Sequence, residues 1–570
     1  WFATDFSSQD PLGALFYAQM RLNGVHIQDG YPCFLTTAHT EDDFRSIAKA
    51  FRDSLDAMQA AGIFSTQEEP SSPTKHAPAA GAKPPSAPLT EAQTEIWLAA
   101  QAGDEASCSF NESFSLTLEG ALDEPAIRKA FDTVIARHDA FHIRFDRSGD
   151  QFRFIPDFKL DLPMLDGVDQ QGLTDLIDDE ARTPFDLIDG PLVRASIVKL
   201  APEKHVLVFT AHHIVCDGWS INNLIEELAT AYEAFKAGSV PEFRPALSFA
   251  TYSTDLSPRP EKSEATEQFW LDQFKTVPDL PDLPLDRPRP EYRSFAGGSC
   301  TGHIDGETYK SLKKRGAKSG ATLFSTLLAT LQVMISRLSG QNDIVIAIPS
   351  AGQSLLDGQI LVGHCVNLLP LRQTVSLTEP FATHLKATQQ LVFQAFEHQD
   401  YTYGTLVRKL EIKRDPRRLP LTEIQFNLER MAGGSSFGDL KSTVEPNAKA
   451  FSNFDLFFNM IEANDHIRID VDYNADVFDR ATVERWIGHF SSLATALAKD
   501  MDHKIGVLPL LSAEEKSWLV NDLNRTAMPY DHDQFVFSLF SKRAMKHPNA
   551  VAAQHDGQTI TYGELEARSN

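Results

Sequence analysis

A cluster of polar residues between a buried strand and a helix constrains this chain more than any other feature. Residues 205–211 read HVLVFTA, an apolar, β-branched and aromatic run that is typical of a covered strand. From Ile221 onward the apolar residues follow helical spacing, and Ser220 is placed to cap that helix. The residues between them, HHIVCDGW at 212–219, therefore gather two imidazoles, a carboxylate and a glycine in one turn.

The two histidines are expected to face in opposite directions, because neighbouring residues at a strand end point to opposite sides. We predict that His212 is turned into the core and that His213 is turned toward open space. A neutral imidazole there can accept a proton near pH 7, or it can hold an amine by a hydrogen bond. The sequence leaves both roles open.

The composition excludes several classes of protein. The 570 residues carry a formal net charge of -25 with no block of basic residues, which argues against a nucleic-acid partner. No apolar run reaches about 18 residues and no secretion signal is recognisable, so no membrane association is predicted. The five cysteines are far apart, which favours a reduced, cytoplasmic protein without disulfides or structural zinc. They are Cys33, Cys108, Cys216, Cys300 and Cys365.

The ends of the chain differ in composition from its middle. The chain begins at Trp1, and we interpret it as a piece of a longer protein. Residues 65–88 contain six prolines and almost no large apolar residue, as expected of an inter-domain linker. Residues 1–64 before it predict strand signals at 25–38 and then an amphipathic helix over 40–61.

The middle of the chain alternates strand-like and helix-like patterns from residue 89 to about 510, which predicts an α/β or α+β body. Its proline-rich segment 275–298 is expected to run over the surface between two halves. Residues 558–570 (QTITYGELEARSN) predict a short strand and the opening of a helix.

Six motifs follow one another through this body. They are LTEAQTEIWL (89–98), RHDAFHIRF (137–145), HHIVCDGWS (212–220), LVGHCVNLLPLR (361–372), HQDYTY (398–403) and RDPRRLPL (414–421). In this order they resemble the condensation domain of non-ribosomal peptide synthetases, over residues ~88–510. The resemblance implies an α/β (α+β) fold of two chloramphenicol-acetyltransferase-like lobes, 89–274 and 275–510, in a V-shaped pseudo-dimer with a central tunnel.

The flanking segments resemble neighbouring domains. Residues 24–44 look like the C-terminal end of a pyridoxal-phosphate (PLP) aminotransferase domain of hybrid polyketide and peptide synthetases, so 1–64 is expected to be a remnant with an incomplete PLP site. Residues 511–570 are similar to a linker and the start of an adenylation domain. Both neighbours are therefore expected partners, and the donor is expected to be an aminated polyketide or a β-amino fatty acyl chain.

The resemblance also implies a reaction. An acceptor amine attacks a donor thioester and forms an amide, with both substrates carried on the 4'-phosphopantetheine of carrier proteins. The upstream partner is then a donor acyl or peptidyl carrier protein, and the downstream partner is an acceptor peptidyl carrier protein. The domain itself is expected to bind no cofactor, and the excised chain is expected to be monomeric.

The resemblance assigns roles within the central motif. His213 is placed beside the amine, with His212, Asp217 and Gly218 completing the catalytic set. Asp217 is expected to act as a structural carboxylate paired with Arg372. The Gly218 N–H, near a helix start, is a candidate donor to the developing oxyanion.

The remaining residues receive binding or structural roles. Trp219, Ser220 and Asn367 are assigned to substrate binding, Asn367 as a second oxyanion donor from the other lobe, and Trp219 is also typical of a core position. Arg137 and Arg414 are assigned structural roles. Cys216 is interpreted as a small buried thiol rather than a nucleophile. Residues 248–256 carry Thr251 where the family often has an acid, which weakens any role for that segment as acceptor-side lining.

Three alternatives stay open. The H-x-x-x-D-G pattern also occurs in free-standing acyltransferases that use coenzyme A, although the D-F-G-W-G motif of their plant-type members is absent. A second alternative is a non-catalytic module that only docks carrier proteins. The last is a metal site built from His212, His213 and Asp217.

Overall fold

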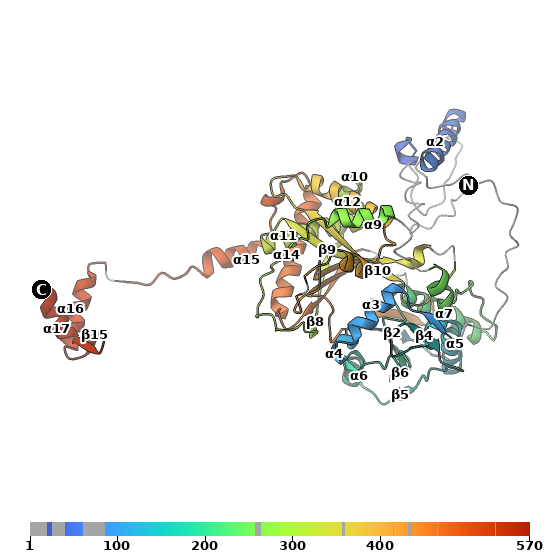
Figure 1. Ribbon diagram of the computed structural model, residues 1–570, viewed down its shortest axis with the longest axis horizontal. Coiled ribbons are helices and arrows are strands. Elements are labelled where there is room, and N and C mark those ends of the chain that lie inside the picture. Colours follow the sequence, from blue (N-terminus) through green and yellow to red (C-terminus); the bar gives the residue numbers. More distant parts are fainter. Residues whose placement is uncertain are drawn as a thin grey trace. The chain divides into compact units, whose positions relative to one another are not determined.

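Two sheets, of five and six strands, organise the chain up to Leu508 (Figure 1). The computed structural model describes residues 20–25, 40–60, 86–256, 264–355, 359–413, 415–430, 436–463, 465–530 and 532–570. A second unit covers Pro509–Asn570, and each unit is described by itself.

The five-stranded sheet carries the central motif. Its strand order is β12-β2-β7-β6-β5, with β12 Lys441–Pro446, β2 Asn111–Glu119, β7 Lys204–His212, β6 Val193–Ala201 and β5 Met164–Asp166. The predicted strand at 205–211 is β7, and every residue from His205 to His212 is buried, as its apolar run predicts. Because β7 is central and covered on both faces, the polar turn that follows it starts from a rigid support.

Helices cover both faces of this sheet. The helices α5 (Glu124–Arg137) and α7 (Gly218–Lys236) pack on one face, where Phe114 and Phe209 lie in the main core. The helix α6 (Gln170–Arg182) places Leu173 against Val198 on the other face. The smaller elements of this half are β1 Ser86–Pro88, α3 Glu91–Ala100, α4 Asp104–Cys108, β3 Ile143–Phe145, β4 Gln151–Phe154 and α8 Phe249–Thr251.

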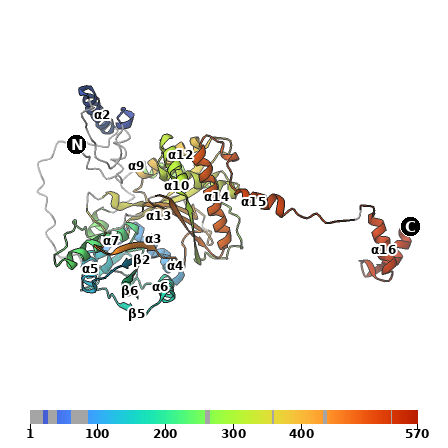
Figure 2. The same ribbon diagram turned by 180° about the vertical axis from the view of Figure 1, so that it is seen from behind.

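The six-stranded sheet has the order β10-β9-β11-β13-β14-β8. Its strands are β8 Gly297–Ile304, β9 Asp343–Ala351, β10 Val366–Thr374, β11 Ile424–Arg430, β13 Leu456–Glu462 and β14 Ile467–Asn474. The helices α10 Gly306–Lys318, α11 Leu323–Ser339, α12 Phe381–Glu397 and α14 Arg480–Lys499 gather on one side of it (Figure 1 and Figure 2). The helices α9 Glu264–Gln273 and α13 Tyr403–Lys409 complete this half.

A polar row crosses this sheet. Register pairs Asn427 with Asn459, Asn459 with Asp470, and Asp470 with Thr301 across four neighbouring strands. Side chains alternate between the two faces of a strand, so these four residues share one face. The sheet is therefore polar along part of one face.

Three pairings cross the predicted domain boundaries. Residues 86–88, assigned to the linker, form the strand β1, which pairs with β4 and tolerates its proline as an edge strand. The strand β12 comes from the second half of the chain but pairs with β2 in the first sheet. The helix α9 was assigned to the first lobe, yet its Trp270 indole donates to the carbonyl of His398 in the second (2.8 Å).

The terminal predictions agree with the structure where it describes them. The helix predicted over 40–61 is α2, Glu41–Ala60. The strand and helix predicted at 558–570 are β16 Gln558–Thr561 and α17 Tyr562–Ser569, and the latter begins with a capping box at Thr561. The second unit also contains α15 Ala513–Ser517, α16 Val536–Lys546 and β15 Val551–His555. The strand signals at 26–38 and the linker at 65–85 lie outside the described residues.

In the described part of the chain, no single helix has the length and apolar character needed to cross a membrane, although α10 and α11 pass that test as a bent pair.

The ring of Phe209 is a test of the five-stranded core. It is 0% exposed and packs against Phe114 and Phe141 with centroids 5.4 and 5.9 Å apart. Phe209→Ala should lower the free energy of unfolding by about 3–5 kcal/mol, because both transfer energy and packing are lost. Urea denaturation followed by circular dichroism measures this change. Phe209→Leu is the matched control and should cost less than about 2 kcal/mol; equal costs would contradict the packing described.

Candidate active site

The His213 ring is fixed through one nitrogen. Its Nδ1 lies 2.7 Å from the carbonyl oxygen of Cys216, and a carbonyl only accepts, so Nδ1 carries the proton. Its backbone N–H donates to the carbonyl of Phe110 (2.7 Å), which ties the turn to the neighbouring chain segment. In the neutral form of the ring, Nε2 is therefore the nitrogen without a proton, and the side chain is half-buried rather than enclosed.

His212 faces the other way, as strand alternation predicts. It is 0% exposed, and its Nδ1 accepts the N–H of Ile214 (3.3 Å) while its Nε2 lies 3.4 Å from the hydroxyl of Ser107. Burial and, to a smaller degree, His213 lower the pKa of His212 to about 3. His212 is therefore neutral at physiological pH and acts as a support for the turn.

A third imidazole, which the sequence reasoning did not single out, lies against His213. The ring of His364 meets that of His213 edge to face, with centroids 4.7 Å apart. Burial, followed by the two neighbouring histidines, lowers the pKa of His364 well below its ordinary value. His364 is thus a neutral ring that limits the orientations open to His213.

The carboxylate of Asp217 joins the two halves of the chain. It is 0% exposed and caps α7, with Oδ1 accepting the backbone N–H of Ser220 at 2.9 Å. Its Oδ2 accepts the Gln353 side-chain amide at 2.6 Å and the backbone N–H of Cys365 at 3.1 Å. Asp217 therefore links the turn at residues 213–217 to two segments of the second half, and charge-assisted bonds of this kind are the stronger ones.

Ser220 strengthens the same link and is fully buried. Its hydroxyl donates to Asp217 Oδ1 (2.7 Å) and accepts the N–H of Gly363 (3.0 Å). Gly363 has a φ of +146°, and a Cβ there would lie 2.1 Å from the ring of Phe249. Only glycine fits this approach. The substrate-binding role predicted for Ser220 is wrong, because its hydroxyl is enclosed and fully used by protein groups.

The predicted pairing of Arg372 with Asp217 is also wrong. Arg372 Nη2 lies 2.7 Å from Asp343 on the adjacent strand β9, and Nη1 donates to the carbonyls of Gln273 (2.8 Å) and Thr276 (2.6 Å). The arginine fastens the end of α9 to the six-stranded sheet. The sequence predicted a cation as the partner of Asp217. In the structure its partners are neutral donors, the Gln353 side chain and backbone N–H groups.

One of the two predicted oxyanion donors, Asn367, is already used by protein groups. The Asn367 amide donates to the carbonyls of Gln399 (2.7 Å) and Tyr401 (2.9 Å), so it has no donor left for a substrate. Gly218 is the first residue of α7, and Glu429 Oε1 lies 4.0 Å from the position a Gly218 Cβ would take. The role of the Gly218 N–H as an oxyanion donor stays a prediction.

Three further predicted residues are Arg137, Trp219 and Arg414. Arg137 donates to Glu227 on α7 (3.2 Å) and to the carbonyl of Arg244, which agrees with a structural role. Trp219 is 40% exposed and so is not a core residue, and its substrate-binding role stays a prediction. Arg414 lies outside the described residues.

Cys216 is chemically inert in this arrangement. It is 0% exposed, and burial followed by Asp217 raises the pKa of its thiol well above the ordinary value. A buried protonated thiol is neither a nucleophile nor a metal ligand. Among the described residues, no group of three or more His, Cys, Asp or Glu side chains is arranged to hold a metal ion. The Nδ1 of His213 and the carboxylate of Asp217 already have protein partners.

Two carboxylates outside the predicted set, Glu112 and Glu429, lie near the turn that carries His213 and Gly218. Glu112 of β2 accepts from Lys449 at 2.6 Å, and Lys449 lies in the second half of the chain. Burial would raise the pKa of Glu112, but Lys449 and then His213 outweigh it, so the pKa lies below the ordinary value. Glu112 is therefore ionised at neutral pH. The sequence alone does not single out Glu112, because one polar residue within a strand belongs to no recognisable motif.

Glu429 differs from Glu112 because its carboxylate is bonded by a neutral amide instead of an ammonium group. Its Oε1 accepts the Asn427 amide at 2.9 Å. Solvent reaches the side chain, yet desolvation by the surrounding protein, followed by the like charge of Glu112, raises its pKa.

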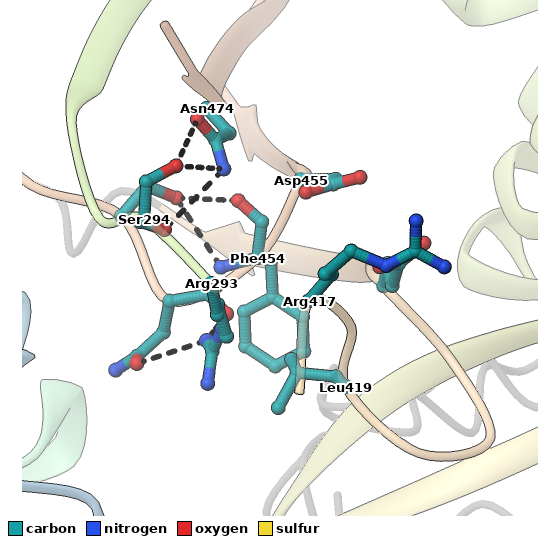
Figure 3. Close-up of a pocket in the computed structure, with 10 residues that line it drawn as sticks. Arg293, Ser294, Arg417, Leu419, Phe454, Asp455 and Asn474 are labelled. Carbon is teal, nitrogen blue, oxygen red and sulfur yellow. Dashed lines mark hydrogen bonds between the residues drawn. The ribbon is translucent and has the colours of Figure 1, made fainter. Parts of the chain in front are cut away.

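A separate pocket lies at the other end of β11 (Figure 3). It is lined by Arg293, Ser294, Arg417, Leu419, Glu423, Ser452, Asn453, Phe454, Asp455 and Asn474. Glu423 precedes β11, whereas Glu429, near Gly218, is almost its last residue. No predicted catalytic residue lines this pocket, and Arg417 on its wall is already paired with Asp415 at 2.8 Å.

Comparison with known proteins identifies the family. A family model described as the condensation domain matches residues 85–520. The chain belongs to the condensation-domain family. Condensation domains are acyltransferases that form amide bonds, so the chain is an enzyme of that class.

Curated relatives share this region. The chain is 32% identical over 495 residues to a subunit of plipastatin synthase from Bacillus subtilis, covering 85% of the chain and 19% of the relative. It is 32% identical over 501 residues to a subunit of linear gramicidin synthase from Brevibacillus parabrevis, covering 85% of the chain and 10% of that protein. The chain thus spans one fifth or less of these relatives.

Solved structures agree on the fold. A four-domain nonribosomal peptide synthetase matches with a TM-score of 0.74 and 20% identity, over 84% of this chain and 38% of that one. The first condensation domain of the calcium-dependent antibiotic synthetase matches with a TM-score of 0.65 and 20% identity, over 75% and 99%. At this identity the match shows the fold alone, and it confirms the predicted α/β architecture.

The Asp217 link yields a stability prediction. Asp217→Asn keeps the shape but removes the charge and one acceptor, so it should lower the free energy of unfolding by about 2–4 kcal/mol. Urea denaturation measures the change. The exposed Asp132→Asn on α5 is the matched control and should change stability by less than about 0.5 kcal/mol. An Asp217 variant as stable as wild type would show that the link is energetically unimportant.

Proposed function

We propose that this condensation domain joins two substrates held on 4'-phosphopantetheine arms of carrier proteins. The amine of a carrier-bound aminoacyl acceptor attacks the thioester carbonyl of a carrier-bound donor acyl chain. The upstream carrier brings the donor, and the downstream carrier brings the acceptor.

One observation carries this proposal: the tautomer and placement of His213. The Cys216 carbonyl fixes the proton on Nδ1, so Nε2 presents a lone pair on the half-buried side of the ring. His364 restricts the ring from one side, with centroids 4.7 Å apart. A lone pair held in this way can orient an amine and receive its proton.

The acceptor nitrogen forms a bond to the donor carbonyl carbon, and its proton passes to Nε2 of His213. The bond between carbon and the donor sulfur then breaks, and the imidazolium returns the proton to the leaving thiolate. His213 ends in its starting form, so no oxidant, reductant or metal is consumed.

The flanking segments support a more specific donor. Residues 1–64 resemble the end of a PLP aminotransferase domain, and residues 511–570 resemble the start of an adenylation domain. We infer that the donor is an aminated polyketide or β-amino fatty acyl chain and that the acceptor is an amino acid selected by the adenylation domain. Both neighbouring domains would then be partners in one assembly line.

His213→Ala tests the proposal. With both carriers loaded, it should lower the rate of amide formation by about 100- to 10,000-fold, because proton transfer and amine orientation are both lost. Intact-mass measurement of the carriers gives the rate. The matched control His466→Ala removes a partly exposed imidazole in the turn before β14 and should keep the wild-type rate.

Two outcomes would overturn the proposal. Undiminished product in the folded His213→Ala variant would favour a non-catalytic docking module. Wild-type turnover of a coenzyme A thioester at the rate of the carrier-bound donor would favour a free-standing acyltransferase.

A further inference from the structure

Glu112 lies close to His213 because of strand register. Glu112 of β2 is opposite Ala211 of β7, and the His213 N–H bonds to Phe110 just before β2. Side chains two residues apart on a strand share a face, so Glu112 and His213 are diagonal neighbours across the strand pair. Diagonal neighbours lie roughly 7–8 Å apart, within reach of long side chains.

The Glu112 carboxylate is itself held in place from the other half of the chain. Lys449 Nζ lies 2.6 Å from Glu112 Oε1, and both side chains are mostly buried, with 24% and 23% exposed. Lys449 follows β12, which pairs with β2 along its length. The ion pair therefore depends on the strand that the second half contributes to the first sheet.

Other ionisable groups also lie near His213. His212 and His364 are neutral because burial lowers their pKa values. Asp217 uses both oxygens on protein donors. The pKa of Glu429 is raised, first by desolvation and then by the like charge of Glu112. Glu112 is thus a second carboxylate near the ring, besides the buried Asp217, and Lys449 is its counter-charge.

Amide formation creates positive charge at this point. The amine becomes cationic as it attacks, and the charge moves to the imidazole when Nε2 takes the proton. A fixed carboxylate several ångströms away stabilises both species more than it stabilises the neutral reactants.

We infer that Glu112 is a positioning residue for this condensation reaction, and that the Lys449–Glu112 ion pair sets the charge felt by His213. Glu112 strengthens His213 as a proton acceptor, and Lys449 orients the carboxylate and moderates its effect. This inference rests on the proposed function of His213.

Variants of Glu112 and of Lys449 should shift the pH–rate profile in opposite directions. Glu112→Gln removes the negative charge and leaves Lys449, so the ascending limb of the pH–rate profile should move to lower pH by about one unit and the plateau rate should fall. Lys449→Met leaves Glu112 uncompensated, so the limb should move to higher pH. The profile is measured by intact mass of loaded carriers between pH 5 and 9.

The opposite pH shifts expected of Glu112→Gln and Lys449→Met distinguish an electrostatic role of the ion pair from a merely structural one. Breaking the pair from either side removes the same contact, so a merely structural role predicts equal loss of rate with no movement of the limb, and that result would overturn the inference. The double variant Glu112→Gln with Lys449→Met should return the limb toward its wild-type position. If the wild type makes amide and His213→Ala does not, an ascending limb that stays at the wild-type pH in both variants contradicts only the role of Glu112 and Lys449. If His213→Ala is fully active, the proposed function itself fails.

Discussion

The structure of the site depends on the buried carboxylate of Asp217. It caps α7, and it also accepts hydrogen bonds from Gln353 and Cys365 in the second half of the chain. A buried carboxylate is costly unless its oxygens are satisfied, so the three segments are held together as a condition of its burial. The turn that carries His213 is therefore fixed at both ends, by β7 before it and by this link after it.

Because the turn is fixed, the tautomer and the orientation of the His213 ring are fixed as well. The carbonyl of Cys216 selects the tautomer of His213, and the neutral ring of His364 limits its rotation. The strand β12 crosses into the first sheet and brings Lys449 to Glu112, which adds a fixed charge beside the ring. Contributions from both halves of the chain thus meet at one imidazole, although the halves are far apart in sequence.

The sequence predicted the elements with local signals and missed those that depend on long-range pairing. Strand β7, helix α7 and the opposite orientations of His212 and His213 follow from periodicity and alternation. Arg372 and Asn367 were misassigned because their partners, on β9 and around residues 399–401, depend on tertiary contacts. The roles of Gln353 and Glu112 also arise only after folding, since neither residue belongs to a motif. The local sequence pattern therefore predicted the turn that carries His213. It did not predict Gln353 and Glu112, which contact this turn or lie near it only in the folded chain.

A double-mutant cycle between Asp217 and Gln353 tests the central claim most directly. Asp217→Asn, Gln353→Leu and the combined variant are compared with wild type by urea denaturation. If the carboxylate links the catalytic turn to the second half of the chain, the two changes should be non-additive, with a coupling energy of about 1–3 kcal/mol, because both remove the same 2.6 Å bond. Additive losses, with a coupling energy near zero, would contradict the account.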